Sequence, residues 1–483
     1  MLVEKQELFS VLQEFNPWWQ TNEVPSLPLW ERTVSRELHD WTNRLDSSRS
    51  LLLSGPRQVG KTTLLLQAIR RLLDKGAKSE TILYATFDHP IIKLAGADTL
   101  IQVWRELNVL PEDQPIYLFL DEIQYVDNWA TWLKHQADFN KSYKIAVTGS
   151  ALPIQKDQES GVGRWETLKI PTLSFYEYLM LRGVTLPEIP QVKSFVDLFS
   201  WSEGDFFKVG RQGQTLVPHF HEYLMRGGFP EPALIDDITR TQKLLREDII
   251  DKVLKRDMTA IFGVRRIIEL EKIFVYLCLH DGGTVDVSKI ASELDGISRS
   301  GVTNFLELFE QSHLVYQLKP YGYGKEVLRG KRKYYLADPA ISGSVLLLGK
   351  RLLQRPEKLG SAVEAVFFKH LFTRYYQQSI GFSYWQDRKG KRKEVDIIAE
   401  FGDHVIPFEV KYQDKLVTQG DVMGLRLFVE DKSLDRGYVI TQRSNDFGPM
   451  EAHSARPGKK SDPLNGRIMK IPAPLACYWL SQS

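Results

Sequence analysis

Cysteine is scarce in this 483-residue chain, which contains only Cys278 and Cys477. Because the two form no CxxC pair, we expect neither a disulfide framework nor a structural zinc site. The 10 histidines show no HExxH or other paired ligand spacing, so we expect no zinc centre built on histidine. This cysteine usage fits a reducing cytoplasm.

Long apolar runs are also lacking. No window holds about 18 uninterrupted apolar residues, so we expect no transmembrane span and no membrane partner. The first residues, Met-Leu-Val-Glu-Lys-Gln-Glu-Leu, are charged and have no apolar signal-peptide core. The formal net charge is only +2, so the chain as a whole does not attract polyanions and any nucleic-acid site must be a local patch.

The composition is that of an ordinary globular protein, with 43% hydrophobic and 26% charged residues. The length allows about three or four domains. A helical lead-in is expected over residues 1–48. From 49 to 180, short apolar stretches alternate with amphipathic ones, which predicts an α/β core with a parallel sheet. The expected strands are 50–54, 81–87, 116–120 and 144–148, and the expected helices are 61–75, 97–107 and 129–140.

The first predicted strand leads into a glycine-rich loop that opens a helix, which is the context a P-loop requires. Backbone N–H groups of such a loop wrap the phosphates of ATP. Lys61 is expected to reach the β and γ phosphates, and Thr62 to ligate Mg²⁺. The residues predicted to bind ATP are Gly55, Pro56, Arg57, Gln58, Val59, Gly60, Lys61, Thr62 and Thr63.

Two further strand ends support this interpretation. The apolar strand 116–120 ends in Asp121, expected to hold Mg²⁺ through water, and Glu122, expected to orient or activate the attacking water. The strand 144–148 ends in Thr148-Gly149-Ser150, where Ser150, with Thr148 as the next choice, is expected to sense the γ-phosphate or position water. A plain serine-glycine turn is the alternative for this last segment.

A mostly helical lid or linker is expected over 181–264, and a winged helix over 265–340, with three helices, a glycine-containing turn and a two-stranded wing. The third helix, 298–312, is the expected recognition helix. Cations here would contact DNA phosphates. The alternative is a module used only for protein packing, with a solvated basic loop. The predicted DNA-binding residues are Arg299, Lys325, Arg329, Lys331, Arg332 and Lys333.

The last section, 355–483, holds the pattern of PD-(D/E)xK nucleases, with Asp396 on one predicted strand and Glu409-Val410-Lys411 on the next. Period-two alternation places Glu409 and Lys411 on one face. Glu364 on the preceding helix adds a carboxylate, and Asp396 and Glu409 are predicted metal ligands. The basic residues Lys391, Arg392 and Lys393 are predicted to contact DNA. A nuclease-like fold kept for binding or assembly is the alternative.

The combination GPRQVGKTT, LFLDE and TGS resembles the AAA+ ATPases. With PTLSF at 171–175 and YLMRGGFPE at 223–231, it looks like a set of bacterial and archaeal AAA+ ATPases that carry a C-terminal restriction-endonuclease-like domain. The resemblance implies that Arg164 acts across a subunit interface as an arginine finger, and that Arg226 senses the nucleotide. By analogy it also implies a homo-oligomeric ring, such as a hexamer.

Three functional hypotheses remain open on the sequence. The first is an ATP-dependent ring motor on duplex or branched DNA, in branch migration, repair or defence. The second is an ATP-controlled binding or assembly switch with an inert C-terminal domain. The third is a metal-dependent DNA nuclease regulated by ATP. All three require ATP and Mg²⁺ as cofactors.

Overall fold

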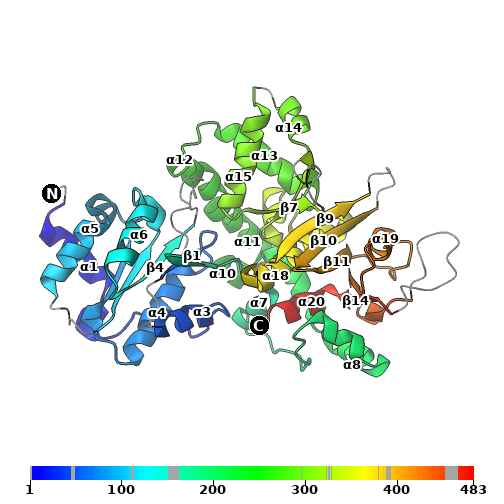
Figure 1. Cartoon of the computed structure of the whole chain (residues 1–483), viewed down its shortest axis with the longest axis horizontal. Coiled ribbons are helices and arrows are strands. Elements are labelled where there is room, and N and C mark those ends of the chain that lie inside the picture. The colour runs from blue at the N-terminus through cyan, green and yellow to red at the C-terminus, as the bar shows by residue number, and fades with distance from the viewer. Residues whose placement is uncertain are drawn as a thin grey trace. The chain divides into compact units, whose positions relative to one another are not determined.

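The computed structural model describes residues 3–44, 49–108, 110, 114–150, 163–294, 296–322, 324, 327, 329–378, 380–387, 393–451 and 466–482. The chain forms two compact units (Figure 1). Unit 1 consists of Met1–Pro171 with two short later segments, Lys255–Arg265 and Gln311–His313. Unit 2 consists of Thr172–Leu254, Arg266–Glu310 and Leu314–Ser483.

Unit 1 is built on a five-stranded parallel sheet with the order β2-β3-β4-β1-β5. The first four strands are almost entirely buried, as expected for parallel strands covered on both faces. The predicted parallel α/β core is therefore confirmed. The strands are β1 (Ser50–Ser54), β2 (Ile82–Thr86), β3 (Ile116–Asp121), β4 (Tyr143–Gly149) and β5 (Trp165–Lys169).

The edge strand β5 was not predicted from the sequence. Its residues, Trp-Glu-Thr-Leu-Lys, are polar and mostly half-buried or exposed, so they lack the apolar run that identified the other strands. Only its pairing with β1, from Ser50↔Trp165 to Ser54↔Lys169, defines it as a strand.

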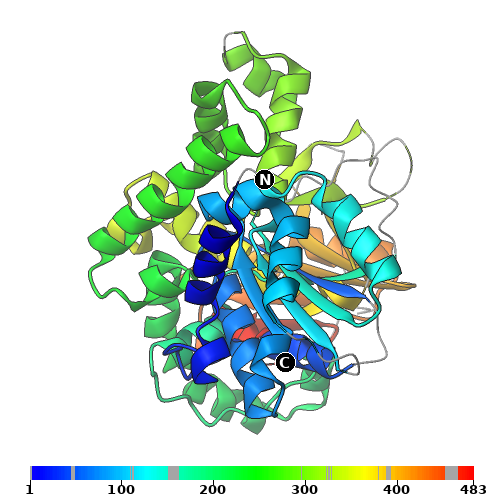
Figure 2. The same cartoon turned by 90° about the vertical axis from the view of Figure 1, so that its left-hand side faces the viewer.

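Helices cover both faces of this sheet, and Figure 2 views unit 1 from the side on which α1 and α5 lie. One face packs in a single core against α1, α5 and α6, through residues such as Leu12, Trp104 and Leu133. The helix α3 packs against α4. The helices are α1 (Lys5–Phe15), α2 (Trp18–Thr21), α3 (Ser35–Asn43), α4 (Lys61–Asp74), α5 (Pro90–Leu107), α6 (Trp129–Phe139) and α12 (Met258–Ala260).

Unit 2 contains a nine-stranded sheet with the order β13-β14-β12-β11-β10-β9-β7-β8-β6. The strands are β6 (Thr284–Val285), β7 (Val315–Pro320), β8 (Arg332–Leu336), β9 (Gly381–Gln386), β10 (Glu394–Phe401), β11 (His404–Lys411), β12 (Gly437–Thr441), β13 (Gly448–Pro449) and β14 (Ile468–Pro472). Parallel pairing of β7 with β9 joins the predicted segments 265–340 and 355–483 into one sheet. The two segments therefore share a single compact unit instead of forming separate ones.

The helical character expected for 181–264 is present. A wide, π-type helix, Leu245–Asp257, follows α11. The helices of unit 2 are α7 (Phe175–Leu181), α8 (Glu203–Gly213), α9 (Leu216–Arg226), α10 (Pro230–Leu234), α11 (Ile238–Leu244), α13 (Ile267–Leu279), α14 (Val287–Glu293), α15 (Arg299–Gln311), α17 (Pro339–Val345), α18 (Pro356–Tyr375), α19 (Met423–Asp431) and α20 (Ala473–Leu480).

Candidate functional site

The glycine-rich loop of unit 1 joins β1 to α4, as the sequence predicted. Gly60 precedes the helix with φ 92°, a left-handed conformation that glycine adopts without steric cost. A Cβ on Gly55 would lie 2.0 Å from the carbonyl oxygen of Ile170, so only glycine fits where the loop passes that backbone. These two glycines let the loop turn tightly enough to direct its N–H groups to one point.

The strand order brings the predicted catalytic residues together. Because β4 lies between β1 and β3, the carboxyl end of β4 is next to both the loop and the end of β3. Ser150 follows β4, whereas Asp121 ends β3 and Glu122 comes directly after it. The three side chains therefore meet beside the start of α4, at the edge of the sheet where open α/β folds bind their ligands.

Lys61 is buried beside these residues, with 4% of its surface exposed. Its Nζ donates to the carbonyl oxygens of Gly55 at 2.9 Å and Pro56 at 2.7 Å, and to Oγ of Ser150 at 3.3 Å. Burial lowers the pKa of Lys61, against the charges of Glu122 and Asp121, which raise it. Among the described residues, the ammonium donates to neutral oxygens, which a phosphate can replace.

Asp121 is the most heavily bonded acid of the site. Its carboxylate accepts from Thr62 Oγ1 at 2.6 Å and from the Tyr84 hydroxyl at 3.1 Å, and it also accepts from Oγ1 of Thr148. Burial, followed by the charge of Glu122, raises the pKa of Asp121, while the threonine hydrogen bonds lower it. Tyr84 was not predicted from the sequence, because it stands among the apolar residues of β2.

Glu122 has a left-handed backbone with φ 54°, a conformation that costs a non-glycine residue on the order of 1–3 kcal/mol. Its N–H donates to Thr148 Oγ1 at 3.0 Å, which helps hold that conformation. Its carboxylate accepts from Ser150 Oγ at 3.0 and 2.9 Å, and from the Gln124 amide. The residues at the end of β4 therefore hold the acids at the end of β3 in place. Ser150 donates to the carboxylate of Glu122, and Thr148 donates to that of Asp121.

Three contacts around the loop were not predicted. Arg57 donates through Nε to the buried carboxylate of Asp257 and through Nη2 to the Tyr125 hydroxyl at 2.8 Å. Ser54 Oγ and His313 Nε2 are 2.9 Å apart. Asp257 and His313 belong to the two short late segments of unit 1, far from the loop in sequence, so no local pattern could have revealed them.

The residues present fit a magnesium nucleotide. Thr62 and Asp121 place a hydroxyl and a carboxylate in mutual contact at the helix start, and oxygen donors of this kind are what Mg²⁺ prefers. Lys61, the loop N–H groups and the helix N-terminus supply the positive potential that a triphosphate needs. The arrangement can therefore bind phosphates at one side and present Glu122 to a water molecule.

Arg164 lies immediately before β5, whose first residue pairs with Ser50 at the start of β1. It is therefore at the amino end of the sheet, opposite to the end that carries the glycine-rich loop. Its Nε donates to Asp138 of α6 at 3.1 Å, and 42% of its side chain is exposed. From this position Arg164 cannot reach the phosphate site of its own unit. Its role across a subunit interface stays a prediction.

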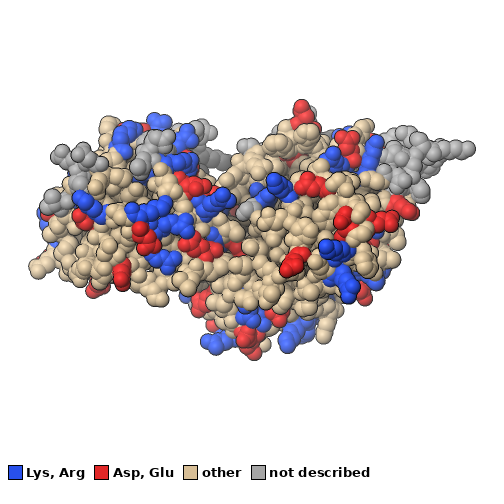
Figure 3. All heavy atoms as spheres, turned by 90° about the horizontal axis from the view of Figure 1, so that it is seen from below, with Lys and Arg blue, Asp and Glu red and all other residues tan. Residues whose placement is uncertain are grey.

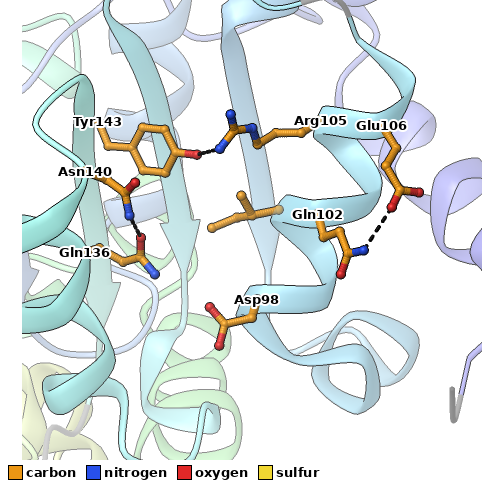
Figure 4. A pocket seen from close by; sticks show the side chains of 8 residues that line it. Asp98, Gln102, Arg105, Glu106, Gln136, Asn140 and Tyr143 are labelled. Carbon is orange, nitrogen blue, oxygen red and sulfur yellow. Dashed lines mark hydrogen bonds between the residues drawn. The ribbon is translucent and has the colours of Figure 1, made fainter.

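A separate hollow of about 400 Å³ lies between α5 and α6 (Figure 4). Its polar groups bond to each other: Arg105 donates to the Tyr143 hydroxyl at 3.0 Å, and Asn140 donates to Gln136 at 2.6 Å. Tyr143 begins β4, so this hollow is at the amino end of the sheet and none of its lining residues belongs to the glycine-rich loop.

In unit 2 the four residues predicted for a nuclease site do come close together. Asp396 on β10 and Glu409 on β11 lie one residue beyond the pair Ile397↔Phe408. Val410 N–H donates to Asp396 Oδ2 at 2.9 Å, and Lys411 Nζ donates to Glu409 Oε1 at 2.5 Å. Glu364 reaches the same place from α18. We call Glu364, Asp396 and Glu409 the carboxylate cluster.

The burial of Lys333 contradicts its predicted role as an exposed DNA contact. Lys333 was predicted to contact DNA from an exposed wing, but it is 3% exposed and lies in the carboxylate cluster. Its Nζ is 2.6 Å from Glu364 Oε1 and 3.3 Å from Asp396 Oδ1. Burial alone would lower the pKa of Lys333, but the charges of Glu364, Tyr335 and Asp396 hold it well above its usual value. Lys333 and Tyr335 are two residues apart in β8 and therefore lie on the same face of the strand. This spacing was the feature of the sequence that could have predicted the burial of Lys333.

The other predicted DNA contacts have mixed surroundings. Arg299 and Arg329 are exposed, Lys393 and Arg332 are partly buried, and Lys331 pairs with Asp286 at 3.0 Å. Lys325, Lys391 and Arg392 lie outside the described residues. The outward residues of α15 include Glu307 and Glu310 beside Thr303 and Asn304. Figure 3 shows a different face, seen from below, on which basic and acidic side chains lie near one another.

The two motifs of the family resemblance, PTLSF and YLMRGGFPE, meet in the core of unit 2. The buried Nζ of Lys369 donates to Thr172 Oγ1 and to the Tyr223 hydroxyl, both at 2.7 Å. Gly228 N–H donates to the buried Asp338 at 2.8 Å. Arg226 bonds the carbonyl oxygens of Ile235 and Asp236, so within unit 2 it secures a turn. Its predicted role as a nucleotide sensor gains no support from these contacts.

Comparison with protein families places the AAA domain at residues 47–179, over the sheet and glycine-rich loop of unit 1. Residues 217–352 match a domain of unknown function, DUF8612, and residues 359–455 match another, DUF4143. Unit 1 therefore carries an AAA-type P-loop core.

An uncharacterized protein of Haemophilus influenzae is 26% identical over 394 residues, covering 79% of this chain and 87% of its own. An uncharacterized protein of Methanocaldococcus jannaschii is 25% identical over 412 residues, covering 84% of each chain. A solved Walker-type ATPase of Pyrococcus abyssi aligns with 13% identity and a TM-score of 0.36, covering 66% of this chain and 99% of that chain. Within the described residues, no helix combines the length and the apolar character needed to cross a membrane.

Proposed function

We propose that unit 1 binds ATP with Mg²⁺ and hydrolyses it. The observation that carries this proposal is the convergence of Lys61, Thr62, Asp121, Glu122 and Ser150 at one edge of the sheet, in an AAA domain. An ordinary pair of surface acids would not be connected to a P-loop lysine through a shared serine.

The residues divide the work as follows. Lys61 exchanges the carbonyl oxygens of Gly55 and Pro56 for phosphate oxygens. Thr62 and Asp121 hold the metal, which neutralises phosphate charge when it is bound. Glu122 orients the attacking water and accepts its proton. Ser150 keeps the Glu122 carboxylate in place and also accepts from Lys61, so it connects the phosphate-binding lysine to the acid that orients water.

The test is Mg-ATP titration and phosphate release by wild type and Lys61→Ala. Loss of this ammonium is expected to lower turnover at least about 100-fold, the size seen when one donor is removed from a charged transition state. Lys75→Ala is the matched control, because Lys75 follows the same helix and its ammonium donates to the Asn43 side chain at 2.7 Å. Equal turnover by Lys61→Ala and wild type would refute the proposal.

We propose duplex or branched DNA as the partner of the segment Ile267–Leu336. Its element order supports this, because three helices, α13, α14 and α15, are followed by β7 and β8, and β6 adds a third strand. That is the order of a winged helix. The exposed Arg299 and Arg329 are the cations best placed for phosphate contact.

This partner is tested by fluorescence anisotropy with labelled duplex and four-way-junction DNA over a salt series. Affinity is expected to fall with salt, and the double change Arg299→Ala with Arg329→Ala to weaken binding to both DNAs and to reduce the salt slope by about two. Lys243→Ala, an exposed lysine of α11, serves as the control. Unaltered affinity in the double variant, or no binding by wild type, contradicts the DNA partner.

Assembly of several copies into a ring, such as a hexamer, is the companion proposal, with Arg164 serving the neighbour's phosphate site. Native mass gives the size. Mixing Arg164→Ala with Lys61→Ala subunits is expected to restore part of the turnover, since each variant keeps what the other lacks. No recovery in mixed assemblies would make Arg164 a surface residue.

A further inference from the structure

We propose that Lys333 serves as the resident cation of the carboxylate cluster, so that this site excludes a divalent metal ion and unit 2 is not a metal-dependent nuclease. The inference concerns unit 2 alone and does not depend on ATP hydrolysis in unit 1.

The ammonium of Lys333 occupies the space between two carboxylates of the cluster. Nζ of Lys333 lies between two carboxylates, 2.6 Å from Glu364 Oε1 and 3.3 Å from Asp396 Oδ1. A Mg²⁺ ion bound between these two carboxylates would need the same oxygens at roughly 2.0–2.1 Å, and a Ca²⁺ ion would need them at roughly 2.3–2.6 Å. An ion at either distance would overlap the ammonium, so the lysine and the metal are alternatives for one space.

Other groups of unit 2 also donate to the carboxylate oxygens of the cluster. Glu364 Oε1 also accepts from the Tyr335 hydroxyl at 2.6 Å, and Asp396 Oδ2 accepts from the Val410 N–H at 2.9 Å. Glu409 Oε1 accepts from Lys411, and its buried Oε2 has no hydrogen-bond partner among the described residues. Within the described residues, no group of three or more His, Cys, Asp or Glu is arranged to hold a metal ion.

Lysines already balance most of the negative charge of the carboxylate cluster. The carboxylate cluster contains three acids, and the ammonium groups of Lys333 and Lys411 face them. Buried carboxylates need such compensation, because an unpaired charge in the interior is strongly destabilising. Two lysines already supply most of it, and a divalent ion added to both would leave the site with excess positive charge.

Lys333 is also firmly placed. It stands in β8, which lies between β7 and β6 in the sheet, and it pairs with Leu318 on one side and Thr284 on the other. The backbone therefore cannot withdraw the side chain without breaking two ladders. The nearby Lys331 differs, because 57% of its side chain is exposed and it pairs with Asp286.

The experiment uses the full chain and Mn²⁺, whose binding is followed by electron paramagnetic resonance. Wild type is expected to take up no Mn²⁺ that depends on Asp396. Lys333→Met removes the charge but keeps a long side chain, and it is expected to lower Tm and to bind Mn²⁺ at least about tenfold more tightly than wild type. Mn²⁺ should then restore part of the lost Tm, and Asp396→Asn in the Lys333→Met background should remove that effect. Lys331→Met is the matched control and should behave as wild type.

Two results would overturn the proposal. One is stoichiometric Mn²⁺ binding by wild type that Asp396→Asn abolishes. The other is a folded Lys333→Met protein that binds no more Mn²⁺ than wild type, because the lysine would then not be what excludes the ion. If Lys333→Met does not fold, Mn²⁺ binding is compared between wild type and Asp396→Asn. Equal binding by the two supports the proposal.

Discussion

Lys61 in unit 1 and Lys333 in unit 2 are both buried lysines beside acidic residues, but different atoms hold them. Lys61 donates to two backbone carbonyls and a serine hydroxyl. Lys333 is bonded to the carboxylates of Glu364 and Asp396. Replacing a neutral oxygen by a phosphate oxygen gains charge–charge attraction, whereas removing Lys333 from its carboxylates would leave buried charges unpaired.

This difference teaches that acids and a lysine in proximity do not by themselves make a catalytic site. The acids of unit 1 are held mostly by hydroxyl groups, namely those of Thr62, Thr148, Ser150 and Tyr84. Their negative charge is left available for a metal and a water molecule. In unit 2 the negative charge of the acids is paired with the buried or partly buried lysines Lys333 and Lys411.

The comparison is tested most strongly by replacing one acid in each unit. Glu122→Gln is expected to bind ATP but to lower its turnover by about 100-fold or more, because the amide cannot accept the proton of water. Glu364→Gln should leave ATP turnover within about twofold while lowering Tm, since breaking a buried ion pair costs about 3 kcal/mol. Phosphate release and calorimetry measure the two effects. Fast turnover by Glu122→Gln would show that unit 1 does not use this acid.

A smaller effect is expected at Asp257, which forms the ion pair of unit 1 most similar to that of Lys333. Asp257 is 1% exposed and bonds Arg57, so Asp257→Asn is expected to lower the stability of unit 1 by about 2 kcal/mol, as for a hydrogen bond to a charged group. Asp88→Asn is the control, because Asp88 pairs with Arg256 at the surface and should contribute about 0–1 kcal/mol. Thermal unfolding of both variants decides, and equal losses would mean that burial of the Arg57 pair has no energetic consequence.

The smallest effect, when the pH is lowered only mildly below neutral, is a pH dependence that compares the same residue type in the two units. His370 in unit 2 is 1% exposed; its Nε2 accepts from Phe175 N–H at 2.8 Å, and its Nδ1 is 2.7 Å from the Val366 carbonyl oxygen. Burial, followed by the charge of Lys369, lowers the pKa of His370 to about 3. Burial likewise lowers the pKa of His313 in unit 1 to about 3.

Since the folded pKa is below the unfolded value of about 6.5, each histidine contributes stability that is complete above that pH. The contribution is lost as pH falls from about 6.5 toward 3, at up to about 1.4 kcal/mol per pH unit for a fully buried group. Thermal unfolding between neutral and mildly acidic pH measures it, and His370→Gln should flatten the dependence. An unchanged slope in that variant would contradict the assignment.

Much of unit 1 was predictable because its signals are local. The strand, loop and helix around Lys61 are consecutive in sequence, and the acids and Ser150 follow apolar strands. The edge strand β5, the tyrosines Tyr84 and Tyr125, and the late residues Asp257 and His313 were not, because their roles come from strand pairing or from segments far apart in the chain.

The sequence alone determined the glycine-rich loop, the strands that end in acids and the residues of the carboxylate cluster, because spacing along one strand or helix fixes which side chains share a face. Only the tertiary structure decided which cation each acid meets. The sequence predicts Lys333 as a surface charge beside a basic loop. In the structure, the long-range pairing of β8 places its side chain in the interior, beside Glu364 and Asp396. An unpaired charged side chain prefers water, so Lys333 can be buried only because carboxylates from other segments of the chain compensate its charge.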